Sequence, residues 1–231
     1  MRTKMVYDLP TRIFHWSFVF LFLSSFIIAK NVDDESIVFA FHMLSGLLLG
    51  FLVIWRIFWG FFGSEHARFI DFSLNPKDLV QYTLGVFTNS KKRWPGHNPA
   101  SSWSTIVMLI LAFGLALTGY LMGSGLKEEI EDIHELMANS FLIVVVMHVI
   151  GVAIHSFQHR DSIALSMLDG KKDLSSEVSS IPNSRGIAAT FLVVFMIVVA
   201  SYLISNFDSN KGTLDFFGRT LTLGEGSGAP E

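Results

Sequence analysis

The chain of 231 residues contains no cysteine. A disulfide framework, a cysteine-ligated iron–sulfur cluster and the Cys-x-x-Cys-His attachment of c-type haem are therefore excluded. Charged residues are also scarce, at 16% of the chain, where a soluble domain carries about 25%. The net charge of −3 is small, and it gives no reason to expect a nucleic acid as partner. Any redox centre must be held by other ligands, and eight histidines are available.

The chain is instead rich in long apolar runs. Five runs are long enough to cross about 30 Å of hydrocarbon as α-helices, and they cover residues 13–29, 37–60, 103–122, 133–157 and 187–204. The first run is too long for a cleaved signal peptide, and Ala29-Lys30-Asn31 is a poor cleavage site. The sequence thus predicts an all-α integral membrane protein whose spans contact the lipid bilayer.

Basic residues predict the orientation of the spans, because they collect on the cytoplasmic side. Thirteen of the 17 Lys and Arg residues are Arg56, near the end of span two, and those of the N-terminal arm, the loop between spans two and three (including Lys91-Lys92-Arg93) and the loop between spans four and five. We therefore expect a cytoplasmic N-terminus. With five spans, the C-terminal tail and the acidic loops at residues 33–35 and 127–129 are expected outside.

Two segments between the spans have helix signals of their own. Asn75-Pro76 is typical of a helix start, and apolar residues follow at helical spacing up to Phe87. This helix either lies on the inner membrane surface or packs on protein. A second short helix is expected from Ser162 to Leu168, ending before Gly170. The tail from Asp208 is polar and rich in Gly, Thr and Ser, which predicts a flexible or partner-bound segment.

Histidine inside a membrane span is costly, so it indicates a functional site. His134 and His148 are 14 residues apart in the fourth span, about 21 Å along one helix and within about 40° of one face. Two haems stacked across a bilayer need ligands at about this separation. His42, near the outer end of span two, and His15, near the inner end of span one, offer the second axial ligands. The expected pairs are His42 with His134 and His15 with His148.

Three further side chains are candidates for holding a cofactor. His155 is about 10.5 Å along the helix from His148, too close for a separate haem. It either bonds a haem propionate, lines a quinone pocket or lies at the membrane interface. His97, in Pro95-Gly96-His97-Asn98-Pro99, either reaches the inner haem or caps the turn. Arg12, one turn before His15, either pairs with a propionate or anchors the inner surface.

Small residues near the histidines have two interpretations. Gly46 and Gly50 follow His42 by four and eight residues, and Gly151 lies in the fourth span. They either leave room for a flat macrocycle or let helices approach closely. Arg56, near the end of span two, is interpreted as a snorkelling anchor at the interface.

The motifs around these residues resemble those of bacterial cytochrome b561-type proteins over about residues 5–172. The resemblance rests on Val6-Tyr7-Asp8-Leu9-Pro10-Thr11-Arg12-Ile13-Phe14-His15-Trp16, His42-Met43-Leu44-Ser45-Gly46, Gly96-His97-Asn98-Pro99, and His134-Glu135 through Ala138-Asn139 to His148 and His155. It implies a four-helix bundle holding two b haems, with His15, His42, His134 and His148 as iron ligands. That family also includes the b-type subunits of membrane-bound nickel–iron hydrogenases.

The expected organisation is a di-haem cytochrome b domain at 5–172, an additional transmembrane helix at 186–205 and a polar external tail at 206–231. The resemblance implies a multi-pass protein of the bacterial inner membrane. It would pass electrons between quinone and a periplasmic c-type cytochrome or other redox subunit. A hydrogenase b-type subunit and a stand-alone superoxide oxidase are alternatives within the same family. A haem-free transporter is a remote alternative, because neither inverted repeats nor broken helices are visible.

Overall fold

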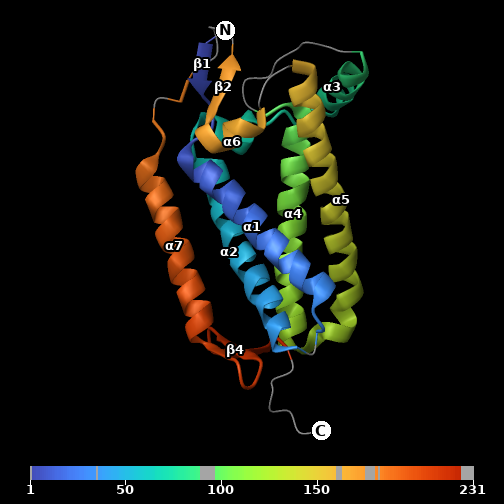
Figure 1. Cartoon of the computed structure of the whole chain (residues 1–231), viewed down its shortest axis with the longest axis vertical. Coiled ribbons are helices and arrows are strands. Elements are labelled where there is room, and N and C mark those ends of the chain that lie inside the picture. Colours follow the sequence, from blue (N-terminus) through green and yellow to red (C-terminus); the bar gives the residue numbers. More distant parts are fainter. Residues whose placement is uncertain are drawn as a thin grey trace. The chain divides into compact units, whose positions relative to one another are not determined.

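The computed structural model describes residues 2–34, 36–88, 97–159, 163–174, 180–181 and 183–224. Most of these residues are helical (Figure 1). The predicted basic cluster Lys91-Lys92-Arg93, Gly96 of the expected turn, and tail residues 225–231 lie outside the described residues.

Long α-helices dominate the described ranges. These ranges contain α1 (Leu9–Asn31), α2 (Ala40–Phe62), α3 (Pro76–Phe87), α4 (Pro99–Leu121), α5 (Lys127–His159), α6 (Ser166–Asp169) and α7 (Gly186–Ser205). Single turns of 3₁₀ helix are η1 (Ile37–Phe39), η2 (Glu65–Ala67), η3 (Phe69–Asp71) and η5 (Ile163–Leu165), and η4 (Met122–Leu126) is a π turn. The strands are β1 (Arg2–Met5), β2 (Lys171–Leu174), β3 (Phe207–Asp208), β4 (Thr213–Phe216) and β5 (Arg219–Thr222).

Four helical segments of the described chain are long and apolar enough to cross a membrane. They are Leu9–Asn31, Ile37–Phe62, Pro99–Gln158 and Gly186–Ser205. The third contains both α4 and α5, which turn at η4, where Gly125 has a φ of 102° that favours glycine. The prediction of a helical membrane protein is confirmed. Five separate crossings and the orientation of the termini stay predictions.

The chain divides into two compact units, to which α1, α2, α4, α5 and α7 each contribute. Unit 1 contains Met1–His15, Trp55–Ile110 and Phe141–Thr190. Unit 2 contains Trp16–Ile54, Leu111–Ser140 and Phe191–Glu231. Each unit is described by itself below.

In unit 1, a buried carboxylate fixes the start of α1. Asp8 Oδ1 accepts a hydrogen bond from the Thr11 backbone N–H at 2.9 Å, which is a helix N-cap. Asp8 Oδ2 accepts from Trp59 Nε1 at 3.1 Å, so the same side chain ties the end of α2 to the start of α1. Asp8 is fully buried, and these two donors satisfy a group that would be costly without partners.

The N-terminal arm of unit 1 pairs with a distant segment. Strands β1 and β2 are antiparallel, with Met5 opposite Lys171, and lie side by side in Figure 1. Just before β2, Gly170 ends α6 with a φ of 80°, and its carbonyl accepts from the backbone N–H groups of Val6 and Tyr7. A Cβ on Gly170 would lie 2.6 Å from the Tyr7 carbonyl oxygen, so the position requires glycine. The predicted short helix ending at Gly170 is confirmed, although it begins in η5, and Ser162 lies outside the described residues.

Helix α3 begins where the sequence predicts. The Asn75 side chain accepts from the Lys77 N–H at 3.0 Å and Pro76 occupies the first turn. One face packs on protein, since Gln158 Nε2 of α5 donates to the Val86 carbonyl at 2.6 Å. The opposite apolar residues Val80 and Leu84 are 57% and 60% exposed. α3 therefore contacts α5 and leaves an apolar face exposed. Packing on protein is confirmed, and a place on the inner membrane surface stays a prediction.

In unit 2, the ends of α4 and α5 next to η4 run antiparallel and close together. A Cβ on Gly114 of α4 would meet the Met137 side chain of α5 at 2.0 Å. The loop before α2 is tied to the start of α5 by an ion pair of 2.8 Å between Asp34 Oδ2 and Lys127 Nζ. The hydrogen bond and charge of Lys127 lower the pKa of Asp34.

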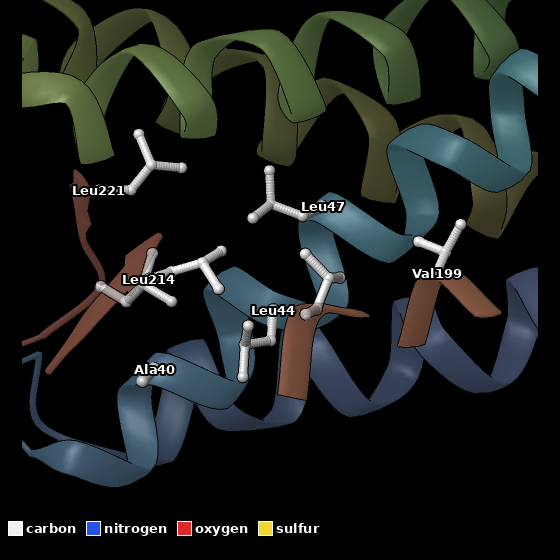
Figure 2. Packing of buried hydrophobic residues seen from close by; sticks show 8 residues of the cluster. Ala40, Leu44, Leu47, Val199, Leu214 and Leu221 are labelled. Atoms are coloured by element: carbon white, nitrogen blue, oxygen red, sulfur yellow. The ribbon is translucent and has the colours of Figure 1, made fainter. Parts of the chain in front are cut away.

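The C-terminal tail of unit 2 is folded. Strands β3, β4 and β5 form an antiparallel sheet in that order. Leu214, Leu221 and Leu223 are at most 2% exposed, and they pack with residues of α2 and α7 in the cluster that Figure 2 shows. Of the two predicted alternatives for the tail from Asp208, flexibility is wrong for residues 208–223, because apolar side chains of the short strands fit this core. Binding to a partner stays a prediction.

Candidate functional site

Unit 2 brings two of the predicted ligand histidines together. His42 lies in the first turn of α2, and His134 lies two turns into α5. Their ring centres are 6.4 Å apart, with the ring planes inclined by 76°. Both side chains are partly buried.

Each of these rings is held through one nitrogen. His42 Nδ1 lies 2.9 Å from the Ser25 carbonyl oxygen and 2.9 Å from the Ser25 hydroxyl. His134 Nδ1 lies 2.7 Å from the Thr118 hydroxyl of α4. Histidines that bind metals commonly use one nitrogen as ligand and hydrogen-bond the other to the protein. In both rings, the nitrogen left for a ligand bond is Nε2.

The spacing of this pair fits one metal ion between the rings. A metal–imidazole nitrogen bond is about 2 Å long, so two rings that bind one metal from opposite sides have centres about 6 Å apart. Two imidazoles alone make an incomplete donor set. Among the described residues, no group of three or more His, Cys, Asp or Glu side chains gathers to hold a bare metal ion. The donor set therefore suits haem, whose macrocycle supplies the remaining ligands.

The glycines near His42 have different surroundings. A Cβ on Gly46 would meet no neighbouring atom of the described chain within 4 Å, which leaves room beside the ring of His42. A Cβ on Gly50 would lie 2.8 Å from the Ala116 Cβ, so Gly50 is where α2 and α4 approach closely. The sequence left clearance and helix contact open for both positions; clearance fits Gly46 and contact fits Gly50.

Unit 1 contains the other predicted pair, His15 of α1 and His148 of α5. The two side chains are partly buried and lie close enough to interact electrostatically. A Cβ on Gly151, one turn after His148, would meet no described neighbour within 4 Å. Open space thus lies beside a predicted ligand in this unit too.

His97 is enclosed by aromatic rings in unit 1. Its ring centre lies 5.5 Å from that of Tyr7 and 4.7 Å from that of Phe72. Burial, followed by the nearby charges of Lys172 and Arg56, lowers the pKa of His97 well below its usual value. His97 is therefore neutral at pH 7 and offers one donor and one acceptor. The next residue, Asn98, caps α4 by accepting from the Ser101 N–H at 2.8 Å.

Arg12 and His155 are both tied to neighbouring segments. The Arg12 Nη1 group donates to the Leu168 carbonyl, while the buried Arg12 Nε has no hydrogen-bond partner among the described residues. His155 is 9% exposed, and its Nδ1 lies 3.5 Å from the Tyr82 hydroxyl of α3. Burial raises the pKa of Tyr82, so this hydroxyl stays protonated at neutral pH.

Arg56 is a buried cation, so its predicted position as a snorkelling anchor at the membrane interface is wrong. It is 2% exposed and donates from Nη2 to the Ala67 carbonyl at 3.1 Å. The Phe69 ring lies 5.2 Å from its guanidinium carbon. Its Nη1 has no hydrogen-bond partner in the described part of the chain. The loop with η2 and η3 folds over this side chain, and nothing in the local pattern of α2 indicates that.

Two hydroxyl residues that contact the His42–His134 pair, Ser25 and Thr118, were also not predicted from the sequence. Ser25 and Thr118 lie in apolar spans, where a hydroxyl usually bonds to its own helix. The only available signal was their depth in spans that also carry histidine. That signal is weak, since other Ser and Thr residues of α4 show it equally.

Comparison with known proteins gives the family. The pattern of the prokaryotic cytochrome b561 family matches residues 6–170. Similar proteins include one described as a probable Ni/Fe-hydrogenase B-type cytochrome subunit of Rhizobium leguminosarum bv. viciae, 25% identical over 72% of this chain and 87% of that protein. A protein of the same description from Bradyrhizobium diazoefficiens is 23% identical over 74% of this chain and 86% of its own. No solved structure matches the chain. The chain belongs to the prokaryotic cytochrome b561 family of membrane electron-transport proteins that bind haem b.

Proposed function

We propose that the protein carries electrons across the bacterial inner membrane through two bis-histidine b haems, between the quinone pool and a periplasmic redox partner. In this proposal His42 and His134 hold the outer haem, and His15 and His148 hold the inner one. The observation that carries it is the His42–His134 pair, with a ring separation of 6.4 Å and both Nδ1 atoms already hydrogen-bonded. Held by these histidines, haem would supply a one-electron couple.

The protein's own residues orient the ligands. The Ser25 carbonyl and the Thr118 hydroxyl hold the two rings of unit 2 by their Nδ1 atoms, which leaves Nε2 of each for iron. The open space at Gly46 leaves room for a flat macrocycle beside His42. In unit 1, Gly151 offers similar space near His148.

Donors in unit 1 suit the carboxylates of the inner haem. Arg12 Nε and Arg56 Nη1 are buried without a hydrogen-bond partner among the described residues, and a carboxylate would satisfy them. His97 lies within the electrostatic reach of both Arg56 and His148, and we place it at the haem edge. His155 and the Tyr82 hydroxyl offer hydrogen bonds that suit a quinone carbonyl.

The start of α5 offers a surface for the redox partner. Exposed carboxylates near His134 are those of Glu128, Glu129, Glu131, Asp132 and Glu135. In the proposed topology of five spans with a cytoplasmic N-terminus, this surface faces the periplasm. A c-type cytochrome or another redox subunit with a basic docking face would be attracted to it.

The test is anaerobic reduction of the purified full chain by a reduced quinol analogue, followed in a reduced-minus-oxidised spectrum. We expect bands of b-type haem to appear on reduction. A chain that contains haem but is not reduced by the quinol contradicts the link to quinone. A chain without b-type bands after dithionite contradicts the haem proposal itself.

A hydrogenase partner is the second candidate, and the two curated relatives favour it because both are described as probable b-type cytochrome subunits of a Ni/Fe-hydrogenase. The electron path would then run from the hydrogenase to quinone. Purification from native membranes, with mass spectrometry of co-purified subunits, separates the candidates. Hydrogenase subunits in the complex support the second, and a c-type cytochrome supports the first.

A further inference from the structure

The hydrogen bond of 2.7 Å between Thr118 Oγ1 and His134 Nδ1 joins two helices of unit 2. Thr118 belongs to α4 and is 8% exposed. A threonine hydroxyl has one hydrogen to donate and lone pairs that accept. The direction of this bond therefore decides which nitrogen of His134 carries a proton.

The surroundings of Thr118 favour one direction of this hydrogen bond. Its hydroxyl lies 2.9 Å from the carbonyl oxygen of Gly114 and 3.2 Å from that of Leu115, both on its own helix. Carbonyl oxygens only accept, so these two neighbours favour donation of the single hydroxyl hydrogen to this helix. In that arrangement the Thr118 oxygen accepts from His134, which places the proton on Nδ1 and leaves Nε2 as the unprotonated nitrogen available for a ligand bond.

His42 reaches the same tautomer by a different route. Its Nδ1 donates to the backbone carbonyl of Ser25 at 2.9 Å, and this acceptor exists whatever the side chain at position 25. The Ser25 hydroxyl, also 2.9 Å away, is an additional contact. The tautomer of His134 thus depends on one side chain, whereas that of His42 is secured by the main chain.

We propose that Thr118 is a positioning residue that selects the tautomer and orientation of His134 for metal coordination and strengthens it as a ligand. This inference rests on the proposed function, in which His42 and His134 bind one haem. A hydrogen bond accepted from the second ring nitrogen makes the ligating nitrogen more basic, which favours the oxidised metal. Thr118 therefore keeps the reduction potential of the outer haem low.

The test compares Thr118→Val, which keeps the shape without the hydroxyl, with Thr118→Ser, which restores the hydroxyl. Thr105→Val is a control on the same helix, since the Thr105 hydroxyl bonds to the Ser101 carbonyl. Each full-length variant is purified in detergent, and its haem content, electron paramagnetic resonance spectrum and redox titration are recorded.

For Thr118→Val we expect outer-haem affinity to fall by about 10- to 100-fold. The haem that remains should titrate at a higher potential, while the inner haem is unchanged. Thr118→Ser and the Thr105→Val control should match the parent protein. Unchanged haem content and potentials in Thr118→Val overturn the inference, and so does equal loss of both haems, which would make the role of Thr118 purely structural. A parent chain that binds no haem instead overturns the proposed function.

Discussion

Leu214 is expected to hold the C-terminal sheet on unit 2. It is fully buried, stands opposite Phe207 and Leu221 in the sheet, and packs in the cluster of Figure 2. Leu214→Ala leaves a cavity, and such a change in a core costs about 2–5 kcal/mol. If the sheet opens as a unit, this cost reduces the free energy of that local opening.

Amide hydrogen exchange of residues 213–222 measures the opening. A loss of about 2 kcal/mol, at about 1.4 kcal/mol for each factor of ten, accelerates exchange roughly 30-fold. Thr220→Ala, at an exposed position of the same sheet, is the matched control, with an expected effect within about 0.5 kcal/mol. Equal exchange in Leu214→Ala and the parent protein would refute the assignment of Leu214 to a sealed core.

Three further predictions concern α1, α2 and His97. Asp8→Ala removes the cap of α1 and the acceptor of Trp59; thermal unfolding should show a loss of about 2–4 kcal/mol. Gly50→Ala would push α2 away from α4, because its Cβ would lie 2.8 Å from the Ala116 Cβ, and should destabilise the protein by about 1–3 kcal/mol. Gly46→Ala, which meets no neighbour within 4 Å, should leave the stability unchanged and lower the haem content. Because His97 has a lowered pKa when folded, stability should fall below about pH 6.5, by up to about 1.4 kcal/mol per unit, and His97→Gln should flatten that slope in unfolding titrations.

The helices could be predicted because their signals are local. Apolar runs of membrane-spanning length need no tertiary information. The five predicted runs correspond to α1, α2, α4, α5 and α7, apart from residues 37–39 in η1 and Met122 in η4. The start of α3 is also a local signal, since Asn75 caps the helix and Pro76 follows it directly. The histidine spacing within α5 is a similar local signal, since helix geometry alone places His134 and His148 on one face.

The features that were missed depend on distant contacts. The buried position of Arg56 comes from the loop at Ala67 and Phe69, which covers a side chain otherwise typical of a membrane interface. The strands of the tail have only two to four residues, too short for a clear alternating pattern. Their burial follows from the α2 and α7 side chains that receive Leu214 and Leu221.

For the proposed ligands, too, local features could be predicted and contacts between distant segments could not. Their matching depth in spans two and four suggested that His42 and His134 belong together, and the structure brings their ring centres to 6.4 Å. Which nitrogen of each ring is left for a metal could not be predicted, because it depends on Thr118 of α4 for His134 and on the Ser25 carbonyl of α1 for His42. A hydrogen bond between helices requires their relative rotation, which a hydrophobic pattern determines only coarsely.

The haem content per chain of the parent protein and of His134→Ala tests whether two histidine pairs hold two haems. Pyridine haemochromogen spectra against quantitative amino-acid analysis give this ratio. We expect two b haems per parent chain and one in His134→Ala, with the remaining haem still bound by two histidines in its electron paramagnetic resonance spectrum. A parent chain with a single haem, or a His134→Ala variant that retains both, would contradict it.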